Sequence, residues 1–458
     1  MTSRTLISRE ELRQSVRLAV PLVIAELGWM LMGIVDTMFV GRLPNSADAI
    51  GAAGLGSLIY INIVLLVGGI VFALDTIISQ AFGAGRLDEC RRAMLHGAYL
   101  AMALTPVIII GTFATIAALP RFGITPSVME LLSTFMGTLA WGTLPLLLYF
   151  VLRRYLQSMN IVGPISFALI SANVVNAFFN WVLIYGNLGA PAMGIEGSAW
   201  ATNIARLYMF LSLAVVGWWH DRTLAHRRVP LGIDFALIGR IVRLGLPIAV
   251  QIGLEIAVFA TAAALIAKIN ATSLAAHEIA MLCASTTFMV PLGVSSAAAV
   301  RVGQAVGRRD QVGMRQAGWT ALLLGVGFMS LSAVAFMTAG HWIVAAFTSD
   351  PQVAGLTVKL LFLAGLFQLA DGTQIVSSGA LRGLGETKVP MYTTMAGYWL
   401  IGLPLGYFLC FRQGMGPVGI WISFVLSLVL VAITLLTVWI KKSQSLPELV
   451  IHAESAHG

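Results

Sequence analysis

Three acidic residues stand inside long apolar stretches of the sequence: Asp36, Glu255 and Asp371. A charged side chain at the centre of a bilayer costs about 2.5–3.5 kcal/mol on insertion scales, so such a residue normally faces the protein interior and has a function. A carboxylate among neutral oxygens suits a hard monovalent cation, or it takes up a proton itself. The three residues are therefore candidate sites for a monovalent cation, with Na⁺ and H⁺ both possible.

Neutral polar side chains lie at the depth expected for Asp36 in two other apolar stretches. A rise of 1.5 Å per residue places Asp36 roughly 22 Å from the cytoplasmic end of its helix. The same rise places Asn176 at roughly 18 Å, Asn180 at roughly 24 Å and Thr202 at roughly 18 Å from that face. We predict that these four residues form one cation site. An asparagine on a membrane helix can also simply bridge two helices, and this alternative applies to Asn173, Asn176 and Asn180.

The other two acids are expected at one common depth. Glu255 lies roughly 12 Å and Asp371 roughly 10 Å from the cytoplasmic face by the same helical rise. Two ionised carboxylates at one depth would repel each other, so either one is protonated or a cation sits between them. We predict that Glu255 and Asp371 take part in cation coupling.

Large, soft side chains near these acids are candidates for contact with an organic ligand. Methionine and aromatic side chains adapt to ligands of different shape. The same residue types also fill cores and face lipid, which is the structural alternative for each of them. The candidates for the lining of a substrate cleft are Trp29, Met32, Phe259, Met289 and Phe367.

Composition indicates that these residues belong to a membrane protein. The 458 residues are 58% hydrophobic and 10% charged, whereas globular domains carry about 25% charged residues. Twelve apolar runs have the length of a membrane-spanning helix, and none alternates with a period of two. The predicted fold class is an all-α polytopic membrane protein. The runs cover roughly residues 18–40, 50–73, 93–118, 128–150, 164–186, 194–218, 244–267, 275–298, 317–340, 354–378, 391–411 and 417–440.

Basic residues gather in alternate gaps between these runs. Of the 28 lysines and arginines, 22 fall in gaps on one side of the predicted membrane and five in gaps on the other side. Cytoplasmic loops carry such an excess of positive charge, so we predict that both termini are cytoplasmic. Because this placement accounts for the net charge of +8, we expect no nucleic-acid partner. The three cysteines are far apart and show no metal-binding spacing.

The two halves of the sequence resemble each other. Arg17–Pro21 recurs 226 residues later as Arg243–Pro247, and Gln80–Gly83 recurs as Gln304–Gly307. The offset covers six apolar runs, an even number, so both halves have the same orientation in the membrane. They are then parallel repeats related by a pseudo-two-fold axis near the membrane normal.

This repeat predicts the organisation of the chain. Residues 1–219 would form an N-terminal six-helix lobe, residues 220–243 a cytoplasmic linker and residues 244–458 a C-terminal six-helix lobe. Two lobes that face each other would enclose a central cleft, the arrangement of an alternating-access transporter. Repeats also occur in proteins that are not transporters.

Four sequence motifs are similar to those of the multidrug and toxic compound extrusion (MATE) family. The similarity covers nearly the whole chain, and the acids Glu255 and Asp371 resemble those of its NorM-type subgroup. The motifs are Val35–Met38, Ser79–Gly85, Gly197–Thr202 and Gly383–Thr387.

The resemblance implies a secondary antiporter that exports organic, often cationic and amphiphilic compounds in exchange for Na⁺ or H⁺. It also implies a first-lobe cation site on Asp36, Asn176, Asn180 and Thr202. The sequence departs from some relatives, which have a second acid at the position of Asn180, and from NorM-type proteins that have tyrosine at the position of Phe367. We expect a monomer in the inner membrane that binds small molecules and needs no cofactor besides the coupling ion.

Two other functions are compatible with a polytopic membrane protein. A lipid-linked oligosaccharide flippase of the same superfamily would need a basic cleft for pyrophosphate, whereas the deep charges here are acidic. An intramembrane enzyme would need a nucleophile–base pair or a metal cluster at depth, whereas all seven histidines lie in gaps or near the ends of runs. We therefore expect a transporter and not an enzyme.

Overall fold

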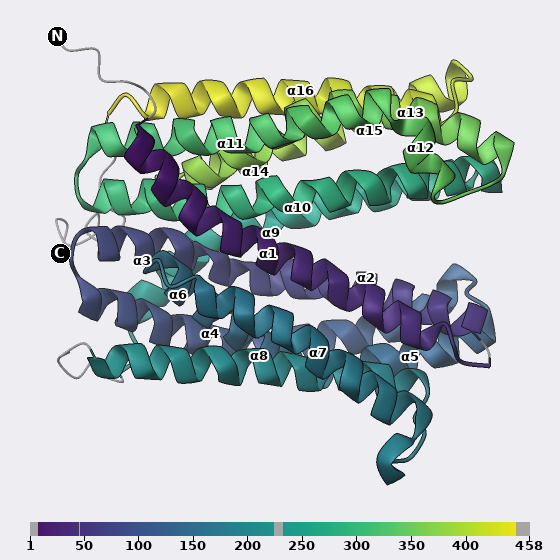
Figure 1. Cartoon of the computed structure of the whole chain (residues 1–458), viewed down its shortest axis with the longest axis horizontal. Coiled ribbons are helices and arrows are strands. Elements are labelled where there is room, and N and C mark those ends of the chain that lie inside the picture. Colours follow the sequence, from purple (N-terminus) through teal and green to yellow (C-terminus); the bar gives the residue numbers. More distant parts are fainter. Residues whose placement is uncertain (1–7, 45, 224–231, 446–458) are drawn as a thin grey trace. The chain divides into compact units, whose positions relative to one another are not determined.

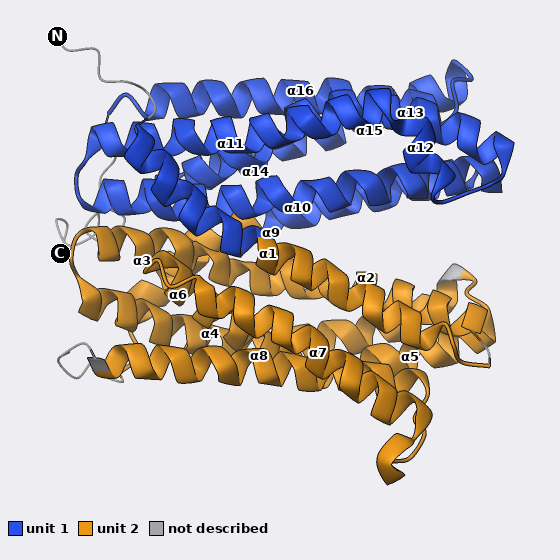
Figure 2. Cartoon of the chain, viewed as in Figure 1, with its two compact units in different colours: residues 1–23, 250–458 blue, residues 24–249 orange. Residues whose placement is uncertain are grey.

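The computed structural model describes residues 8–44, 46–223 and 232–445, which fold into helices joined by short connections (Figure 1). The chain forms two compact units (Figure 2). Unit 1 comprises Met1–Val23 and Val250–Gly458, and unit 2 comprises Ile24–Ala249. Two long helices, α1 and α9, belong partly to each unit.

Unit 2 contains most of α1 and the helices of the N-terminal half. Gly186, with a φ of 74°, ends α7 in the left-handed conformation that glycine adopts without strain. The elements are α1 (Arg9–Val40), α2 (Ser46–Gly68), η1 (Gly69–Ala73), α3 (Leu74–Gly83), α4 (Leu87–Ala118), η2 (Leu119–Phe122), α5 (Pro126–Trp141), α6 (Thr143–Ser158), α7 (Gly163–Tyr185), η3 (Asn187–Gly189) and α8 (Ile195–Thr223).

Unit 1 contains most of α9 and all later helices. Asn270, Asp310 and Asp350 cap the first turns of α10, α11 and α13, where their side chains accept hydrogen bonds from backbone N–H groups. The elements are α9 (Phe235–Ala267), α10 (Ala271–Gly307), α11 (Gln311–Thr338), α12 (Gly340–Ala345), α13 (Pro351–Gly383), α14 (Lys388–Thr394), the π-helix η4 (Met395–Gly402), α15 (Leu403–Tyr407), the π-helix η5 (Phe408–Arg412) and α16 (Pro417–Lys442).

The described helices confirm an all-α polytopic fold. Eleven of them are long and apolar enough to cross a membrane, and there are twelve spans if the bent pair α5 and α6 counts as one. The predicted run over residues 128–150 corresponds to this pair, in which α5 and α6 meet at a bend of 50°. Gly142 separates the two helices.

The division into two six-helix lobes stays a prediction. The compact units follow it approximately but place residues 1–23 with the C-terminal half. The predicted linker over residues 220–243 lies partly outside the described residues, at 224–231. Its first four residues belong to the last turn of α8, and its last nine belong to the first turns of α9.

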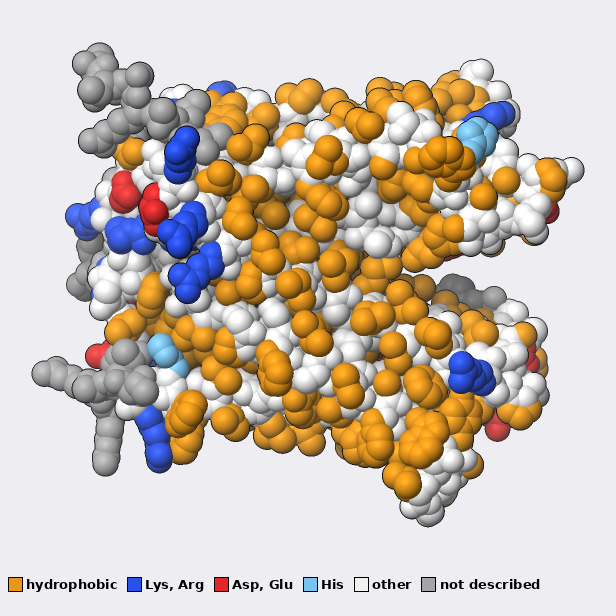
Figure 3. Space-filling model, viewed as in Figure 1, with side chains coloured by type: hydrophobic (Ala, Val, Ile, Leu, Met, Phe, Trp, Pro, Cys, Tyr) orange, Lys and Arg blue, Asp and Glu red, His pale blue; other side chains and the backbone are white. Residues whose placement is uncertain are grey.

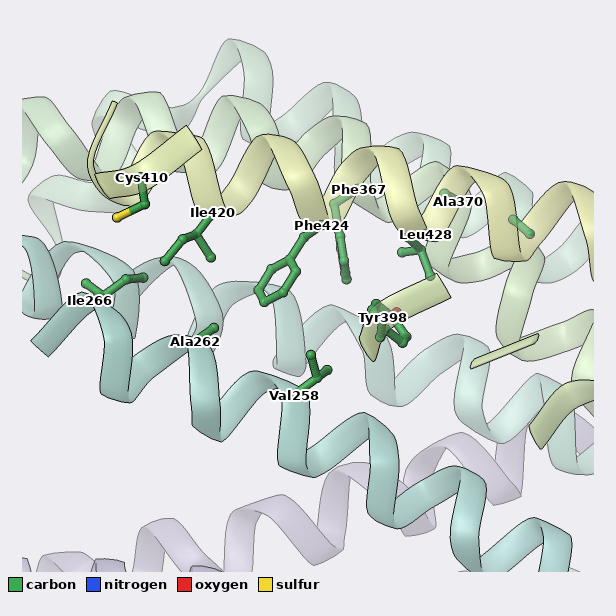
Figure 4. Packing of buried hydrophobic residues seen from close by; sticks show 11 residues of the cluster. Val258, Ala262, Ile266, Phe367, Ala370, Tyr398, Cys410, Ile420, Phe424 and Leu428 are labelled. Atoms are coloured by element: carbon green, nitrogen blue, oxygen red, sulfur yellow. The ribbon is translucent and has the colours of Figure 1, made fainter. Parts of the chain in front are cut away.

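One of the apolar clusters buried in unit 1 consists of side chains from α9, α13, η4, η5 and α16 (Figure 4). Phe259 packs edge-on against Phe367, Tyr398 and Phe424, with ring centres 5.3–6.3 Å apart. Such edge-to-face pairs add about 0.5–1.5 kcal/mol to the burial of each ring. On the surface of unit 1, the charged side chains visible in Figure 3 gather mainly at the end where α1 begins, and hydrophobic side chains cover most of the remaining length.

Small residues allow close helix packing in unit 1. A Cβ at Gly379 would lie 2.3 Å from the backbone oxygen of Ser295, and one at Gly383 would lie 2.7 Å from that of Ala299. The two glycines are four residues apart on α13, as in the small-residue pattern that brings membrane helices together. They hold α10 and α13 in direct backbone contact.

Candidate functional site

The four residues predicted for a first cation site lie together in unit 2. Asp36 Oδ1 accepts hydrogen bonds from Asn180 Nδ2 at 2.7 Å and from Asn176 Nδ2 at 2.9 Å. Asp36 Oδ2 accepts one from the Thr202 hydroxyl at 3.0 Å. The two asparagines are fully buried, whereas Asp36 is partly accessible. The structure therefore brings α1, α7 and α8 together around a single carboxylate.

Helix geometry fixes this arrangement on α7 and α8. Asn176 and Asn180 are one turn apart, and Asn180 Nδ2 also donates to Asn176 Oδ1 at 3.0 Å. Gly197 lets α8 approach α7, since a Cβ there would lie 2.6 Å from the backbone oxygen of Leu183. The α7–α8 contact thus places Thr202 opposite the asparagine pair.

One buried oxygen of this site has no hydrogen-bond partner within the described chain: Oδ1 of Asn180. Leaving a buried polar atom unsatisfied costs about 1–3 kcal/mol. The Asp36 carboxylate, this amide oxygen and the Thr202 hydroxyl are all hard oxygen donors, which suits a cation such as Na⁺. The donor set is therefore compatible with a monovalent cation.

Asn173 has a different role from the other two asparagines. Its Nδ2 donates to the backbone oxygens of Gly28 and Leu169, both at 2.9 Å. It joins α7 to α1, and within the described chain it makes no hydrogen bond to Asp36. For this residue the helix-bridging alternative is correct.

The second predicted pair of acids lies in unit 1. Glu255 Oε1 accepts hydrogen bonds from Gln374 Nε2 at 2.8 Å and from Gln251 Nε2 at 3.1 Å, with the Thr394 hydroxyl at 3.5 Å. Asp371 is 7% exposed and interacts electrostatically with Glu255. Within the described chain, no hydrogen bond or ion pair reaches the Asp371 carboxylate.

The partners of Glu255 were not predicted from the sequence. Gln251 is one turn before Glu255 on α9, and Gln374 is one turn after Asp371 on α13. A polar residue one helical turn from a buried acid is the signal that would identify both. Thr394 precedes the π-helix η4, and the backbone geometry there has no sequence signature that we recognise.

The three candidate acids differ from the other buried acids in their partners. Within the described residues, none of Asp36, Glu255 and Asp371 has an arginine or lysine at ion-pair distance. Other buried acids do form such pairs: Asp75 with Arg154 at 2.9 Å, Glu11 with Arg301 at 2.6 Å, and Glu26 with Arg153. Asp36 and Glu255 instead have neutral hydrogen-bond partners, which is compatible with the predicted binding of a cation.

The residues predicted for a substrate cleft lie in both units and differ in exposure. In unit 2, Trp29 is half-buried and stacks on Tyr149 with ring centres 6.5 Å apart, and Met32 is buried. In unit 1, Phe259 and Met289 are half-buried, and Phe367 is buried in the apolar cluster. No cluster of three or more His, Cys, Asp or Glu side chains that could hold a metal ion occurs in the described part of the chain.

The sequence matches a known family twice. The family model MatE matches residues 21–182 and again residues 247–408, so the second match begins 226 residues after the first. This offset equals that of the repeat found between Pro21 and Pro247, which confirms the internal repeat.

Similar proteins have related names. The chain is 37% identical over 450 residues to a probable multidrug resistance protein NorM of Mesorhizobium japonicum, covering 96% of each chain. It is 35% identical to the protein of the same name in Brucella suis biovar 1, covering 94% of this chain and 93% of that one. These similarities favour the efflux prediction over the flippase and the intramembrane enzyme.

Solved structures show the same fold. The eukaryotic MATE transporter AtDTX14 superposes with a TM-score of 0.85 at 20% identity and covers 96% of this chain and 99% of its own. An outward-facing multidrug resistance MATE family transporter gives a TM-score of 0.83 at 18% identity, covering 95% of this chain and 96% of its own. Together with the matches over almost the whole sequence, these results place the chain in the MATE family of multi-pass, ion-coupled multidrug efflux transporters.

Proposed function

We propose that this transporter exports organic, often cationic and amphiphilic compounds in exchange for Na⁺ or H⁺ by alternating access. The observation that carries the proposal is the environment of Asp36. Its carboxylate has three neutral hydrogen-bond donors and no cationic side chain at ion-pair distance within the described chain. Such a carboxylate can bind and release an ion, because no arginine or lysine side chain of the described chain forms a salt bridge with it.

The Thr202 hydroxyl provides a local change that would accompany ion binding. Its Oγ1 lies 3.0 Å from Asp36 Oδ2 and 3.1 Å from the backbone oxygen of Ser198. A hydroxyl has one hydrogen to donate. When that hydrogen points to Ser198, the Thr202 lone pairs and Asp36 Oδ2 both face a bound cation. When the site is empty, the hydrogen returns to Asp36.

Glu255 and Asp371 would form a second cation-coupling site in unit 1. Two interacting carboxylates favour a shared proton or a cation between them, because both cannot ionise freely at short range. Gln251 and Gln374 orient Glu255 through its Oε1, while Asp371 keeps no hydrogen-bond donor within the described chain. Asp371 is thus the acid of the pair that is free to respond to an ion.

The ion and the exported compound would weaken each other's binding. A lipophilic cation is attracted by the same carboxylates that take up Na⁺ or H⁺, so occupancy by one disfavours the other. Aromatic side chains add cation–π attraction and apolar contact. We propose Trp29, Met32, Phe259, Met289 and Phe367 as residues that contact the compound.

The membrane potential supplies the free energy for export. One charge that crosses 100 mV releases about 2.3 kcal/mol. We propose that the protein lies in the inner membrane as a monomer, with both termini in the cytoplasm. In this proposal the lobes of residues 1–219 and 244–458 alternate the access of the sites to the two sides.

Transport in proteoliposomes of known orientation tests this proposal. The vesicles are loaded with a fluorescent organic cation, and sodium and proton gradients are imposed separately. We expect a jump in one of the two ions to drive export of the dye, and the Asp36→Asn variant to lose this response. Dye movement that ignores both gradients would exclude the antiport proposal.

A further inference from the structure

Arg206 is a buried arginine in the middle of α8. Its Nη1 donates to the Tyr60 hydroxyl at 3.2 Å, to the Leu139 backbone oxygen at 3.3 Å and to Asn203 Oδ1 at 3.4 Å. Its guanidinium also lies 4.9 Å from the centre of the Tyr60 ring. Every one of these partners is neutral. No carboxylate lies at ion-pair distance from Arg206 within the described residues, although a buried arginine is usually paired.

Arg206 and Asp36 are close without touching. Thr202, which donates to Asp36 Oδ2, precedes Arg206 by four residues on α8, so both side chains lie on one face of that helix. The guanidinium interacts electrostatically with the Asp36 carboxylate. The side chains that contact Asp36 directly, on α7 and α8, are all neutral. Arg206 is therefore the charged group on α8 that acts on Asp36.

The break between α5 and α6 holds the guanidinium in place. Leu139 lies in the last turn of α5, and the C-terminal end of a helix attracts a cation. Gly142, at the break, leaves room for the polar groups: a Cβ there would lie 2.0 Å from Asn203 Oδ1 and 3.2 Å from Arg206 Nη1. Asn203 is anchored in turn, because its Nδ2 donates to the Thr138 backbone oxygen at 2.7 Å.

We propose that Arg206 is a fixed counter-charge for the Asp36 site and sets how tightly this site holds a monovalent cation. The inference rests on the proposed function, in which Asp36 binds the coupling ion. With both groups charged, the empty site is neutral, so the buried carboxylate costs less free energy. Because the neutral partners hold Arg206 away from a direct salt bridge, the Asp36 oxygens stay open. A bound cation is repelled by Arg206, which favours its release.

A purely structural role for Arg206 makes different predictions. If the guanidinium only caps the end of α5, its loss lowers stability and the amount of active protein but leaves the ion dependence unchanged. If it acts as a counter-charge, its loss increases the affinity for the ion. If a unit charge lies roughly 10 Å from the bound ion and the effective dielectric constant is about 20, removing that charge changes the ion affinity about tenfold.

The experiment measures release of a bound fluorescent organic cation from purified protein as sodium concentration or pH is varied. For Arg206→Gln we expect half-maximal release at about a tenfold lower sodium or proton concentration. Arg206→Lys keeps the charge and should stay within about threefold of the unmodified protein. Tyr60→Phe removes one partner but no charge, and it should not shift the midpoint. Arg121→Gln, which removes an exposed arginine from η2, is the matched control.

The inference would be overturned if Arg206→Gln and Arg206→Lys both released the fluorescent cation at the same sodium or proton concentration as the unmodified protein. Ion-dependent release that persists in Asp36→Asn would instead overturn the proposed ion site, so the two failures are distinguishable. If Arg206→Gln does not fold, the double variant Arg206→Gln/Asp36→Asn decides. Recovery of folded protein in the double variant supports compensation between the two charges, and equal loss contradicts it.

Discussion

Asn180 donates its amide hydrogen to Asp36 at 2.7 Å, although 144 residues separate the two positions in the chain. Asn176 donates to the same carboxylate oxygen, so Oδ1 has two amide donors and Oδ2 has only the Thr202 hydroxyl. The amides are held by α7 and by each other, whereas a hydroxyl can rotate. In the proposed ion site, Oδ2 is therefore the oxygen that would become accessible by the smaller rearrangement.

The Asp36→Asn substitution should abolish ion-coupled efflux. An amide is nearly the same size as the carboxylate but carries no charge and cannot hold Na⁺ or a proton as tightly. We expect cells that produce the variant to lose drug resistance, while the amount of variant protein in the membrane stays near that of the unmodified protein. Efflux of a fluorescent cation and quantitative immunoblotting of membranes check both parts. Full resistance in this variant would contradict the site.

Thr202 allows a sharper test of ion coordination. Thr202→Val has the same shape but no hydroxyl, so it removes a hydrogen bond to a charged group and one oxygen ligand. We expect the cation concentration for half-maximal transport to rise about tenfold or more, corresponding to about 1.5–3 kcal/mol. Thr202→Ser keeps the hydroxyl and should restore most of the affinity. Equal behaviour of the two variants would show that the hydroxyl is not a ligand.

The asparagines of α7 provide a matched pair of variants on one helix. Asn180→Ala removes a donor to Asp36 and the unpartnered Oδ1, so we expect at least about a tenfold loss of ion affinity. Asn173→Ala removes bonds to the backbone oxygens of Gly28 and Leu169, and it should lower the thermal stability with no change in ion affinity. Interhelical hydrogen bonds of this kind contribute about 0.6–2 kcal/mol. Titration of ion-dependent transport, with thermal unfolding in detergent, distinguishes the two effects.

Much of the first site could be predicted because its four residues share one depth. Asp36, Asn176, Asn180 and Thr202 fall in one layer if each helix rises 1.5 Å per residue, and the structure joins them. Depth does not determine which face of a helix points inward, so the helix-bridging alternative stayed open for Asn173, Asn176 and Asn180 alike. Rotation about the helix axis comes from packing, which a single sequence does not reveal.

Other features depend on local backbone geometry. The bend at Gly142 and the π-helix η4 lie inside runs whose mean hydropathy is high throughout, and hydropathy does not show where a helix bends or changes type. The ion pair of Asp75 is a further example, because its partner Arg154 lies on α6, 79 residues away in the sequence. Pairing between distant helices requires the fold to be known.

Asp371→Asn should also abolish efflux without preventing membrane insertion. Asp371 has no hydrogen-bond donor of its own within the described chain, and it acts electrostatically on Glu255. Removing its charge leaves Glu255 as an ordinary acid bound by two glutamine amides, so the pair no longer shares an ion. Gln374→Ala removes one hydrogen-bond donor to Glu255. It should change the ion concentration for half-maximal transport but keep transport coupled to the ion. Dye export in proteoliposomes measures both variants, and coupled export by Asp371→Asn would exclude the second site.

The start of α9 should lose stability in acid because of Asp234. The Asp234 carboxyl accepts hydrogen bonds from the backbone N–H groups of Leu237 and Ala236, at 3.1 and 2.9 Å, and pairs with Arg92 at 2.7 Å. The Leu237 N–H above all, together with Arg92, lowers the pKa of this carboxyl below its usual value. A lowered pKa in the folded state means that the stabilisation is complete above the unfolded value of about 3.9 and is lost as the pH falls through the folded value. Hydrogen-exchange protection factors of the first turn of α9 should therefore fall below about pH 4 in the unmodified protein. Asp234→Asn keeps a good capping side chain that does not titrate, so the protection factors of this variant should be independent of pH across that range. If they also fell in acid, another group would be responsible for the effect.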